Sequence, residues 1–269
     1  MLRRLFILLV LAGTPFAAGA DEMLLPGGLK AGGSAMAIEV IDGDTLTLDD
    51  GREVRLVGLQ APKLPLGRRG FKTWPLASDA KAALGRLALG RRLALYYGGR
   101  EADRHRRLLA HLADAETGRW IQGAMLAQGM ARVYTFEDNR SAIAEMLAIE
   151  RAARAAKRGI WSHPYYAIRT PETVARDADS FQLVEGTVRD VAERKGKTFL
   201  NFGADWRSDF TVLVESRDAK AFRAAGMALK DLEGRRIRVR GWIKSWNGPL
   251  IEATHPEQIE TAGQGPAAR

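Results

Sequence analysis

Two aspartates separated by one glycine, Asp42 and Asp44 in the segment VIDGDTLTL, are the first residues whose types and spacing could do chemistry. On an extended strand, residues two positions apart face the same side, so both carboxylates would point in one direction. Paired carboxylates near a turn can hold a hard cation such as calcium. They can equally form a solvated turn, and the three residues alone do not distinguish these interpretations.

Basic side chains follow in two further segments. Arg55 lies in VRLVGLQAPK, which ends with Gln60 and Lys63, and EADRHRRLLAHL carries Asp103 and Arg107. A guanidinium group binds phosphate through parallel hydrogen bonds. The first of these segments thus ends with an amide and an ammonium, which do not supply the carboxylate oxygens that a hard cation prefers.

Hydrophobic periodicity predicts the elements that must position these residues. Alternating apolar residues in AIEVIDGDTLTL and REVRLVGL, separated by the turn residues DDG, predict a β-hairpin or meander. The period then changes to that of a helix over residues 76–87, and strands are expected over residues 91–97 and in RRLLAHL. Two more helices are expected over residues 121–128 and 141–157.

The ordered blocks VIDGDTLTL, VRLVGLQAP, EADRHRRLLAHL, IQGAMLAQGMARVY and ERAARAAKRGIWS resemble the staphylococcal nuclease (thermonuclease) family over about residues 36–163. The resemblance implies a mixed α+β fold, a five-stranded oligonucleotide/oligosaccharide-binding (OB) barrel with three helices. It also implies an ancestry in calcium-dependent hydrolysis of phosphodiester bonds in DNA and RNA.

The resemblance assigns roles to particular residues. Asp44 matches a metal-binding carboxylate of the family, whereas Arg55 and Arg107 match the arginines that clamp the phosphate. The residues matching supporting positions are Asp42, Thr45 and Asp103. A dication and two guanidinium groups would together neutralise the charge that develops on phosphorus.

The chain departs from the family where the family has Asp-Thr-Pro-Glu. Gln60 replaces the second metal carboxylate, Ala61 replaces the threonine, and Lys63 replaces the glutamate that orders the attacking water. The site therefore gains formal positive charge, which weakens its attraction for a cation. Calcium would be the cofactor if the protein is active. Gln60 could still offer its amide oxygen beside Asp44. An ammonium group cannot accept a proton from water, so Lys63 does not replace the missing glutamate.

The termini and a break in periodicity predict the domain boundaries. Residues 1–20 read as a cleaved secretory signal, which predicts export to the periplasm or outside the cell. Residues 21–35 are predicted to be a flexible tether, 36–163 the first barrel, 164–179 a linker, 180–260 a second OB-like barrel, and 261–269 a disordered tail. The chain contains no cysteine, which excludes disulfides and thiolate metal sites.

Basic and aromatic residues interleave in two places, a pattern typical of surfaces that contact single-stranded nucleic acid. A loop carries Arg68, Arg69, Lys72 and Trp74. In the second barrel, the candidate groove residues are Lys195, Lys197, Trp206, Arg207, Arg238, Arg240, Trp242, Lys244 and Trp246.

Three functions remain open from the sequence. The replaced site residues favour an exported protein that binds nucleic acid or another phosphate-bearing polyanion without cleaving it, with Arg55, Lys63 and Arg107 as phosphate-binding candidates. Alternatively, Asp44 and the same arginines serve an active calcium-dependent nuclease with a nonstandard water activator, or the barrels bind protein or carbohydrate in a cell-envelope interaction protein. Within the cleft itself, the alternative to phosphate binding is a salt-bridged network of Asp44, Arg55, Lys63 and Asp103 without a ligand. The formal net charge of +9 supports a polyanionic partner without identifying it.

Overall fold

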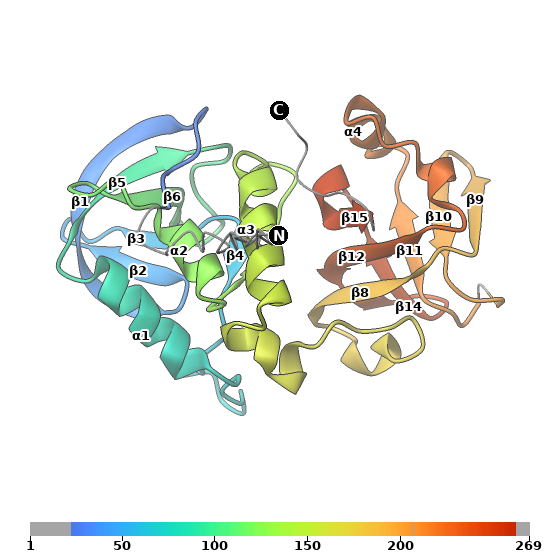
Figure 1. Cartoon of the computed structure of the whole chain (residues 1–269), viewed down its shortest axis with the longest axis horizontal. Coiled ribbons are helices and arrows are strands. Elements are labelled where there is room, and N and C mark those ends of the chain that lie inside the picture. Colours follow the sequence, from blue (N-terminus) through green and yellow to red (C-terminus); the bar gives the residue numbers. More distant parts are fainter. Residues whose placement is uncertain (1–22, 206, 262–269) are drawn as a thin grey trace, which may run out of the picture.

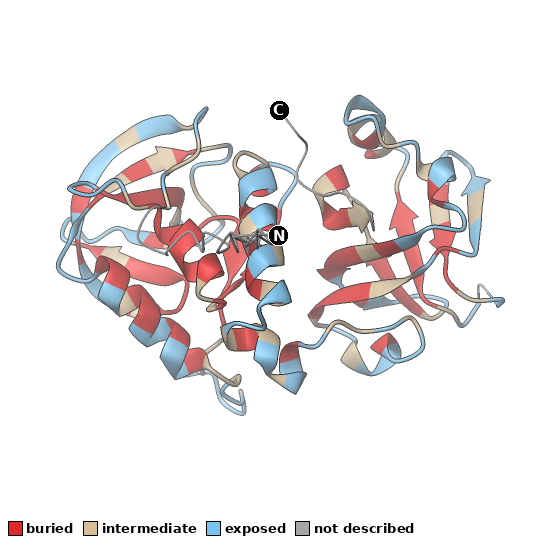
Figure 2. Ribbon diagram, viewed as in Figure 1, coloured by how far each residue is buried: buried red, intermediate tan, exposed pale blue. Residues whose placement is uncertain are grey.

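Two β-rich halves lie side by side in the computed structural model, which describes residues 23–205 and 207–261 (Figure 1). Each half has its own hydrophobic core, one drawn from residues 35–147 and the other from residues 174–259. Figure 2 shows the buried residues gathered in these two places, and α3 stands between them. The halves therefore correspond to two folding units joined by one connection.

The first half is a closed five-stranded barrel, as the sequence predicts. Its strands pair in the order β1-β2-β3-β6-β5, and β3 and β6 run parallel to each other. The strands are β1 (Lys30–Asp42), β2 (Thr45–Leu48), β3 (Glu53–Leu56), β5 (Arg92–Tyr97) and β6 (Leu108–Asp114). Alternate residues of β5 point into the barrel, because side chains on a strand alternate between its two faces.

Strand β1 begins earlier than the sequence predicts. Residues 30–35 were expected to belong to a flexible tether, but they pair with β5, so this part of the prediction is wrong. The glycines that indicate a tether serve packing instead: a Cβ on Gly32 would lie 2.1 Å from the ring of Tyr97. Glycine lets β1 pass close to this aromatic ring while it bends around the barrel.

Three helices cover the barrel: α1 (Ala77–Ala88), α2 (Ile121–Ala127) and α3 (Ile143–Ala155). The buried face of α1 is rich in alanine, which allows the helix to approach the strands closely. A short two-stranded sheet of β4 (Leu59–Gln60) and β7 (Arg132–Val133) lies beside the barrel. This small sheet carries Gln60 to the side that faces the second half.

Residues 164–179 form an ordered connection between the halves. It contains the short 3-10 helices η3 (Pro164–Tyr166) and η4 (Val174–Asp177), after η2 (Gly159–Ser162) at the end of the first half. Val174 is buried in the second core, and Tyr166 Oη donates a hydrogen bond to the Pro75 carbonyl at 2.6 Å. The connection therefore packs against both halves.

The second half consists of two sheets around one core, in the orders β13-β14-β11-β10-β9 and β15-β12-β8. Its strands are β8 (Phe181–Thr187), β9 (Asp190–Arg194), β10 (Lys197–Asn201), β11 (Thr211–Val214), β12 (Arg236–Trp242), β13 (Lys244–Ser245), β14 (Pro249–Glu252) and β15 (Ile259–Thr261). Its helices are α4 (Ala219–Ala224), η5 (Leu229–Leu232) and η6 (Pro256–Gln258).

The second half follows the strand order of the first if β8 and β9 are taken together as the counterpart of β1. Strands β10, β11, β14 and β12 then correspond to β2, β3, β6 and β5, and β11 and β14 are parallel, as β3 and β6 are. The predicted second barrel is open in one respect, because the two sheets do not join through a hydrogen-bonded ladder between β12 and β14 in the described part of the chain.

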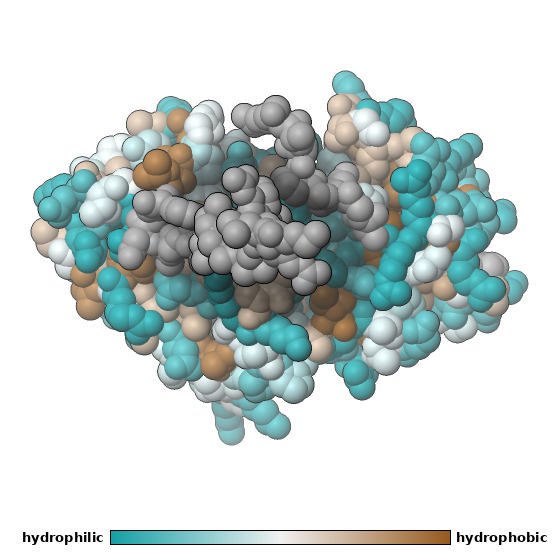
Figure 3. Space-filling model, in the orientation of Figure 1, coloured by the Kyte–Doolittle hydropathy of each residue, from teal (hydrophilic) through white to brown (hydrophobic). Residues whose placement is uncertain are grey.

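The visible surface is mostly hydrophilic, with hydrophobic residues in small separate spots on the face drawn in Figure 3. Within residues 23–205 and 207–261, no helix is both long and apolar enough to cross a membrane. The predicted signal sequence and residues 262–269 of the predicted tail lie outside the described residues. Thr261, predicted to begin this tail, instead ends β15 and pairs with Ile237, because the sheet extends one residue further than the sequence predicts.

Candidate functional site

The two aspartates of the DGD segment lie at the end of β1 and directly before β2, where the chain is buried. Asp44 is fully buried and Asp42 is 3% exposed. A Cβ on Gly43 would lie 2.7 Å from the Cβ atoms of both Ala61 and Ala80. Glycine is therefore required here, because it lets the turn pass under β4 and α1 and carries both carboxylates inward.

The ammonium group of Lys63 lies between these carboxylates. Lys63 Nζ is 2.6 Å from Oδ1 and 2.7 Å from Oδ2 of Asp44, and it donates to Oδ2 of Asp42 at 3.1 Å. The backbone N–H of Ala61 also donates to Asp44 Oδ2, at 2.7 Å. The segment QAPK therefore folds back onto the DGD turn, and its lysine fills the space between the two acids.

Arg55 completes the cluster from strand β3. Its Nη1 lies 2.5 Å from Asp44 Oδ1, and its Nη2 donates to the carbonyl of Leu59 at 3.0 Å. The register of the barrel brings the arginine here, because β2 pairs Thr45 with Arg55. We call Asp42, Asp44, Arg55 and Lys63 the DGD cluster; its acidic and basic side chains are equal in number.

The charges in the cluster move the pKa values of its acids in opposite directions. Burial alone would raise the pKa of Asp44, but Arg55, Lys63 and the N–H of Ala61 together hold it well below its usual range. Burial and the adjacent charge of Asp44 raise the pKa of Asp42, and the attraction of Lys63 offsets this only in part. Asp44 is therefore the acid most firmly held in its ionised form.

Asp103 and Arg107 form a separate pair on the approach to β6. Arg107 Nε donates to Asp103 Oδ2 at 2.8 Å, and the backbone N–H of Arg107 donates to Oδ1 at 3.0 Å. Burial raises the pKa of Asp103, but the hydrogen bonds from Arg107 and His105 bring it below its usual range. All three phosphate-binding candidates, Arg55, Lys63 and Arg107, are thus paired with an aspartate.

Gln60 points away from the DGD cluster. Its Oε1 accepts hydrogen bonds from Nε and Nη2 of Arg132 at 3.0 and 2.8 Å, and Arg132 Nη2 also donates to the carbonyl of Phe181 at 2.7 Å. Arg132 forms no ion pair with a carboxylate of the described residues, and its burial lowers its pKa to about 10. The predicted metal-ligand position therefore contributes instead to the contact with the second half.

These residues do not fit a calcium ion. Calcium takes six to eight oxygen ligands, mostly from carboxylates and carbonyls. Both oxygens of Asp44 already face cations or an N–H group, and the amide oxygen of Gln60 faces Arg132. Within residues 23–205 and 207–261, no group of three or more His, Asp or Glu side chains has the spacing of a metal site.

The basic loop between Lys63 and α1 is exposed. The guanidinium of Arg68 lies 3.7 Å from the ring centre of Phe71, and the rings of Phe71 and Trp74 stack at 6.4 Å. Arg69 and Lys72 are exposed as well. No carboxylate of the described residues forms an ion pair with these basic side chains, so their charge is available at the surface.

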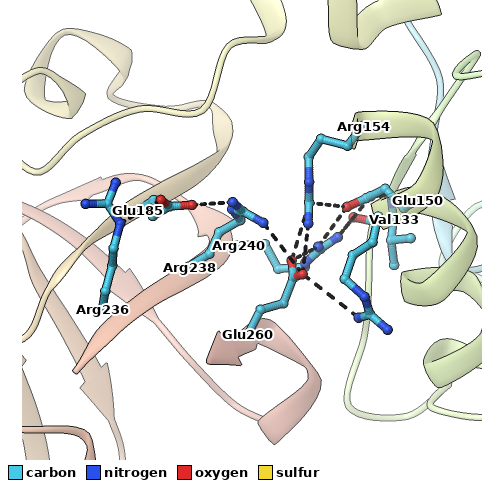
Figure 4. A network of polar contacts seen from close by, with 9 residues as sticks. Val133, Glu150, Arg154, Glu185, Arg236, Arg238, Arg240 and Glu260 are labelled. Carbon is cyan, nitrogen blue, oxygen red and sulfur yellow. Dashed lines mark hydrogen bonds and ion pairs between the residues drawn. The ribbon is translucent and has the colours of Figure 1, made fainter. Parts of the chain in front are cut away.

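A buried ion network joins the two halves beside β7 and α3 (Figure 4). Glu150 on α3 is fully buried and accepts from Arg240 Nη2 at 2.9 Å and from Arg154 Nη1 at 2.9 Å. Arg240 also donates to Glu260 Oε1 at 2.5 Å. Burial would lower the pKa of Arg240, but Glu150 and Glu260 raise it above its usual value.

The predicted groove of the second half is not one surface. Arg240 is buried in the ion network, so its assignment to a nucleic-acid groove is wrong, and Arg238 pairs with Glu185. Trp242 Nε1 donates to Tyr134 Oη across the interface at 2.6 Å. Two lysines are in ion pairs, Lys197 with Glu215 and Lys244 with Glu252.

The other candidates lie on loops. Lys195 and Arg207 are exposed, Trp246 lies beside an open pocket, and Trp206 lies outside the described residues. Arg132 and Glu150, which form contacts between the halves, were not among the predicted functional residues. Both lie in regions of helical or strand periodicity, and no local pattern indicates their partners.

Comparison with known proteins agrees with this geometry. A profile described as "Staphylococcal nuclease homologue" matches residues 53–163. Protein ParB of Escherichia coli is 30% identical over 138 residues, which cover 48% of this chain and 72% of that protein. The chain belongs to the staphylococcal nuclease homologue family.

Membership places the family's features in the first half. The matched region contains Arg55, Gln60, Lys63 and Arg107, and it ends where the ordered connection begins. The resemblance inferred from the sequence and the predicted barrel are both confirmed. The second half lies outside the matched region.

Proposed function

We propose that this protein is a noncatalytic member of the nuclease family that binds nucleic acid without cleaving it. The observation that carries the proposal is the position of Lys63, whose ammonium lies within hydrogen-bonding distance of both Asp44 and Asp42. A cation of this chain thus neutralises the acids that would otherwise hold a metal ion.

The same cluster has no group that could activate water. General-base catalysis needs an acceptor within reach of the water that it deprotonates. Asp44 is buried and fully engaged, and Asp42 accepts from the backbone N–H of Asp44 on one oxygen and from Lys63 on the other. Lys63 stands at the position of the family's glutamate and donates hydrogen bonds there instead.

Nucleic-acid binding rests on membership in the family and on surface charge. The formal net charge is +9, of which Arg3 and Arg4 in the predicted signal contribute two. Arg68, Arg69 and Lys72 are exposed next to aromatic rings, an arrangement that can contact phosphates and bases of a single strand. Arg55 and Arg107 are each paired with an aspartate, so they would contribute less to nucleic-acid binding than this loop.

Cleavage of a fluorophore-quenched single-stranded DNA, with calcium and with a chelator, tests whether the protein is noncatalytic. We expect no calcium-dependent cleavage by the natural protein. A Lys63→Glu, Gln60→Asp variant restores both carboxylates and tests whether the cleft can still accept a metal. Calcium-dependent turnover by the natural protein that disappears in Asp44→Ala would refute the noncatalytic assignment.

Fluorescence anisotropy of labelled single-stranded DNA over a range of salt concentrations tests whether the protein binds nucleic acid. A variant with alanine at Arg68, Arg69 and Lys72 should bind more weakly and show a shallower salt dependence, because fewer counterions are released. The matched control places alanine at Lys81, Arg86 and Arg92, which are also exposed. Absence of binding by the natural protein would instead favour a protein- or carbohydrate-binding role in the cell envelope.

The cellular location is part of the same proposal. The composition of residues 1–20 supports export and cleavage after Ala20. The N-terminal sequence of the protein purified from a periplasmic fraction should begin at Asp21. Recovery of the intact Met1 form from the cytoplasm would contradict export.

A further inference from the structure

The second half carries an open pocket on the outer face of its larger sheet. Its volume is about 370 Å³, within the size range of pockets that bind small ligands. Strands β9, β10, β11 and β14 form its floor, and the turn between β13 and β14 forms one wall. The residues on which the argument depends are Asp190, Arg194, Phe199, Asn201, Trp246 and Leu250.

Part of the floor of this pocket is apolar although it is the outer face of a sheet; Asn201 and Thr211, which hydrogen-bond to each other, supply its polar part. Ala192 and Phe199 pair across β9 and β10, and Leu250 lies opposite Thr211 on β14. An outer sheet face that meets only water normally carries polar side chains. The core lies on the opposite side of these strands, so packing within the second half does not account for Phe199 here.

Trp246 stands above this floor on a well-held turn. Trp246 is 53% exposed, and its backbone N–H donates to the carbonyl of Gly248 at 2.9 Å. A Cβ on Gly248 would lie 2.5 Å from the carbonyl oxygen of Ser208, so the turn packs directly against a neighbouring loop. A large aromatic ring is thus kept at the surface by a fixed backbone, where it can stack on a planar ligand.

Polar groups mark the two ends of the pocket. Asp190 Oδ2 accepts from Asn201 Nδ2 at 3.0 Å, whereas its Oδ1 has no hydrogen-bond donor among the described residues. Arg194 lies four residues further along β9, about 13 Å away at the rise of a strand, and pairs with no described carboxylate. The pocket therefore offers an acceptor at one end and a positive charge at the other.

We propose that this pocket binds an unpaired base of single-stranded nucleic acid, stacked on Trp246, with its N–H edge at Asp190 and a backbone phosphate towards Arg194. This inference rests on the proposed function and adds a second contact to it, remote from the DGD cluster. The faces of a base can pack against Phe199 and Leu250, while its polar edge reaches Asp190. Guanine, with two adjacent N–H donors, best matches the carboxylate.

Fluorine NMR of the full-length mature protein labelled with 5-fluorotryptophan tests the pocket directly. The resonance of Trp246, assigned by its loss in Trp246→Phe, should shift on addition of millimolar GMP, and less with AMP, CMP or UMP. The resonance of Trp242, also exposed but engaged at the interface, should stay unchanged. Asp190→Asn should reduce the shift with GMP, because the amide nitrogen repels the N–H donors.

Anisotropy titrations with guanine-containing single-stranded DNA test the contribution to polymer binding. Trp246→Ala should lower the affinity about 5- to 100-fold, the effect of removing one stacking aromatic. Trp242→Phe is the matched control and should leave the affinity unchanged. Equal losses in both variants, or none in Trp246→Ala, would overturn the proposal, as would a Trp246 resonance that moves with chito-oligosaccharides and not with nucleotides.

The two tests separate this inference from the proposed function. If the protein binds no single-stranded DNA but GMP shifts the Trp246 resonance, the nucleotide pocket stands and polymer binding fails. If DNA binds and Trp246 responds to no nucleotide, polymer binding stands and the pocket assignment is wrong.

Discussion

Replacing Lys63 with methionine would remove the cation from the DGD cluster while keeping an unbranched side chain of similar length. Among the described residues, the change leaves the buried carboxylate of Asp44 with Arg55 as its only ion-pair partner and leaves Asp42 with none. We expect a large loss of stability, because buried acids whose cation has been removed retain the cost of leaving water.

The structure sets the size of this loss. Removing one partner of a buried ion pair costs about 3–5 kcal/mol. The Lys63 side chain is 19% exposed and Arg55 remains beside Asp44, so we expect the lower end of this range. A loss of about 3 kcal/mol is a substantial part of the roughly 5–15 kcal/mol that stabilises an ordinary domain.

The loss should depend on pH with a definite sign. The pKa of Asp44 is depressed by folding, so its stabilising contribution is present above the unfolded pKa of about 3.9 and disappears as pH falls through the folded value. The pKa of Asp42 is raised, so folding favours its protonated form and its contribution falls as pH rises. Lys63→Met raises both pKa values. The penalty should therefore be complete at pH 7 and shrink towards pH 4, by about 1.4 kcal/mol per unit of added shift.

Guanidinium unfolding followed by circular dichroism at several pH values measures this effect, provided that the dependence on denaturant keeps its slope. Lys81→Met, at an exposed position of α1, is the control and should change the free energy of unfolding by less than about 0.5 kcal/mol. A Lys63→Met variant as stable as the natural protein at pH 7 would refute the reasoning. A penalty that grows as the pH falls would refute the assignment of the titrating acids.

Two further predictions concern the interface between the halves. Gln60→Ala leaves Arg132 buried without its side-chain acceptor, and we expect a loss of about 1–3 kcal/mol in denaturant unfolding, whereas Gln60→Glu should retain the contact; equal stability of the alanine variant would contradict this role. His255 of the second half lies with its Nε2 2.7 Å from Oγ1 of Thr135 in the first half. Burial lowers the pKa of His255 to about 4, so its stabilising contribution is complete above the unfolded pKa of about 6.5 and declines by about 3 kcal/mol as the pH falls to 4. His255→Gln should flatten this part of the pH profile in thermal unfolding, and an unchanged profile would show that another group, such as His111, is responsible.

Hydrophobic periodicity predicted most strands and helices of the first half, because the buried face of each element shows as a repeat of apolar residues in its local sequence. The alternation in AIEVID and the helical spacing after Pro75 correspond to β1 and α1, and the DGD and QAPK segments were recognised as parts of one site. The prediction was wrong at Gly32, because glycine occurs there for close packing against Tyr97 and not to make the chain flexible.

The local sequence establishes the kinds of groups in the site: two acids, an arginine, a lysine and a glutamine. The partner of each group depends on the tertiary structure. Lys63 meets Asp44 across 19 positions of sequence, and Gln60 meets Arg132 across 72. An ion pair or hydrogen bond depends on which strands pair and how closely the chain returns to itself, and neither is expressed in the local pattern of polar and apolar residues. In the folded chain, Lys63 contacts the acids of the DGD cluster, and Gln60 contacts Arg132 beside the second half.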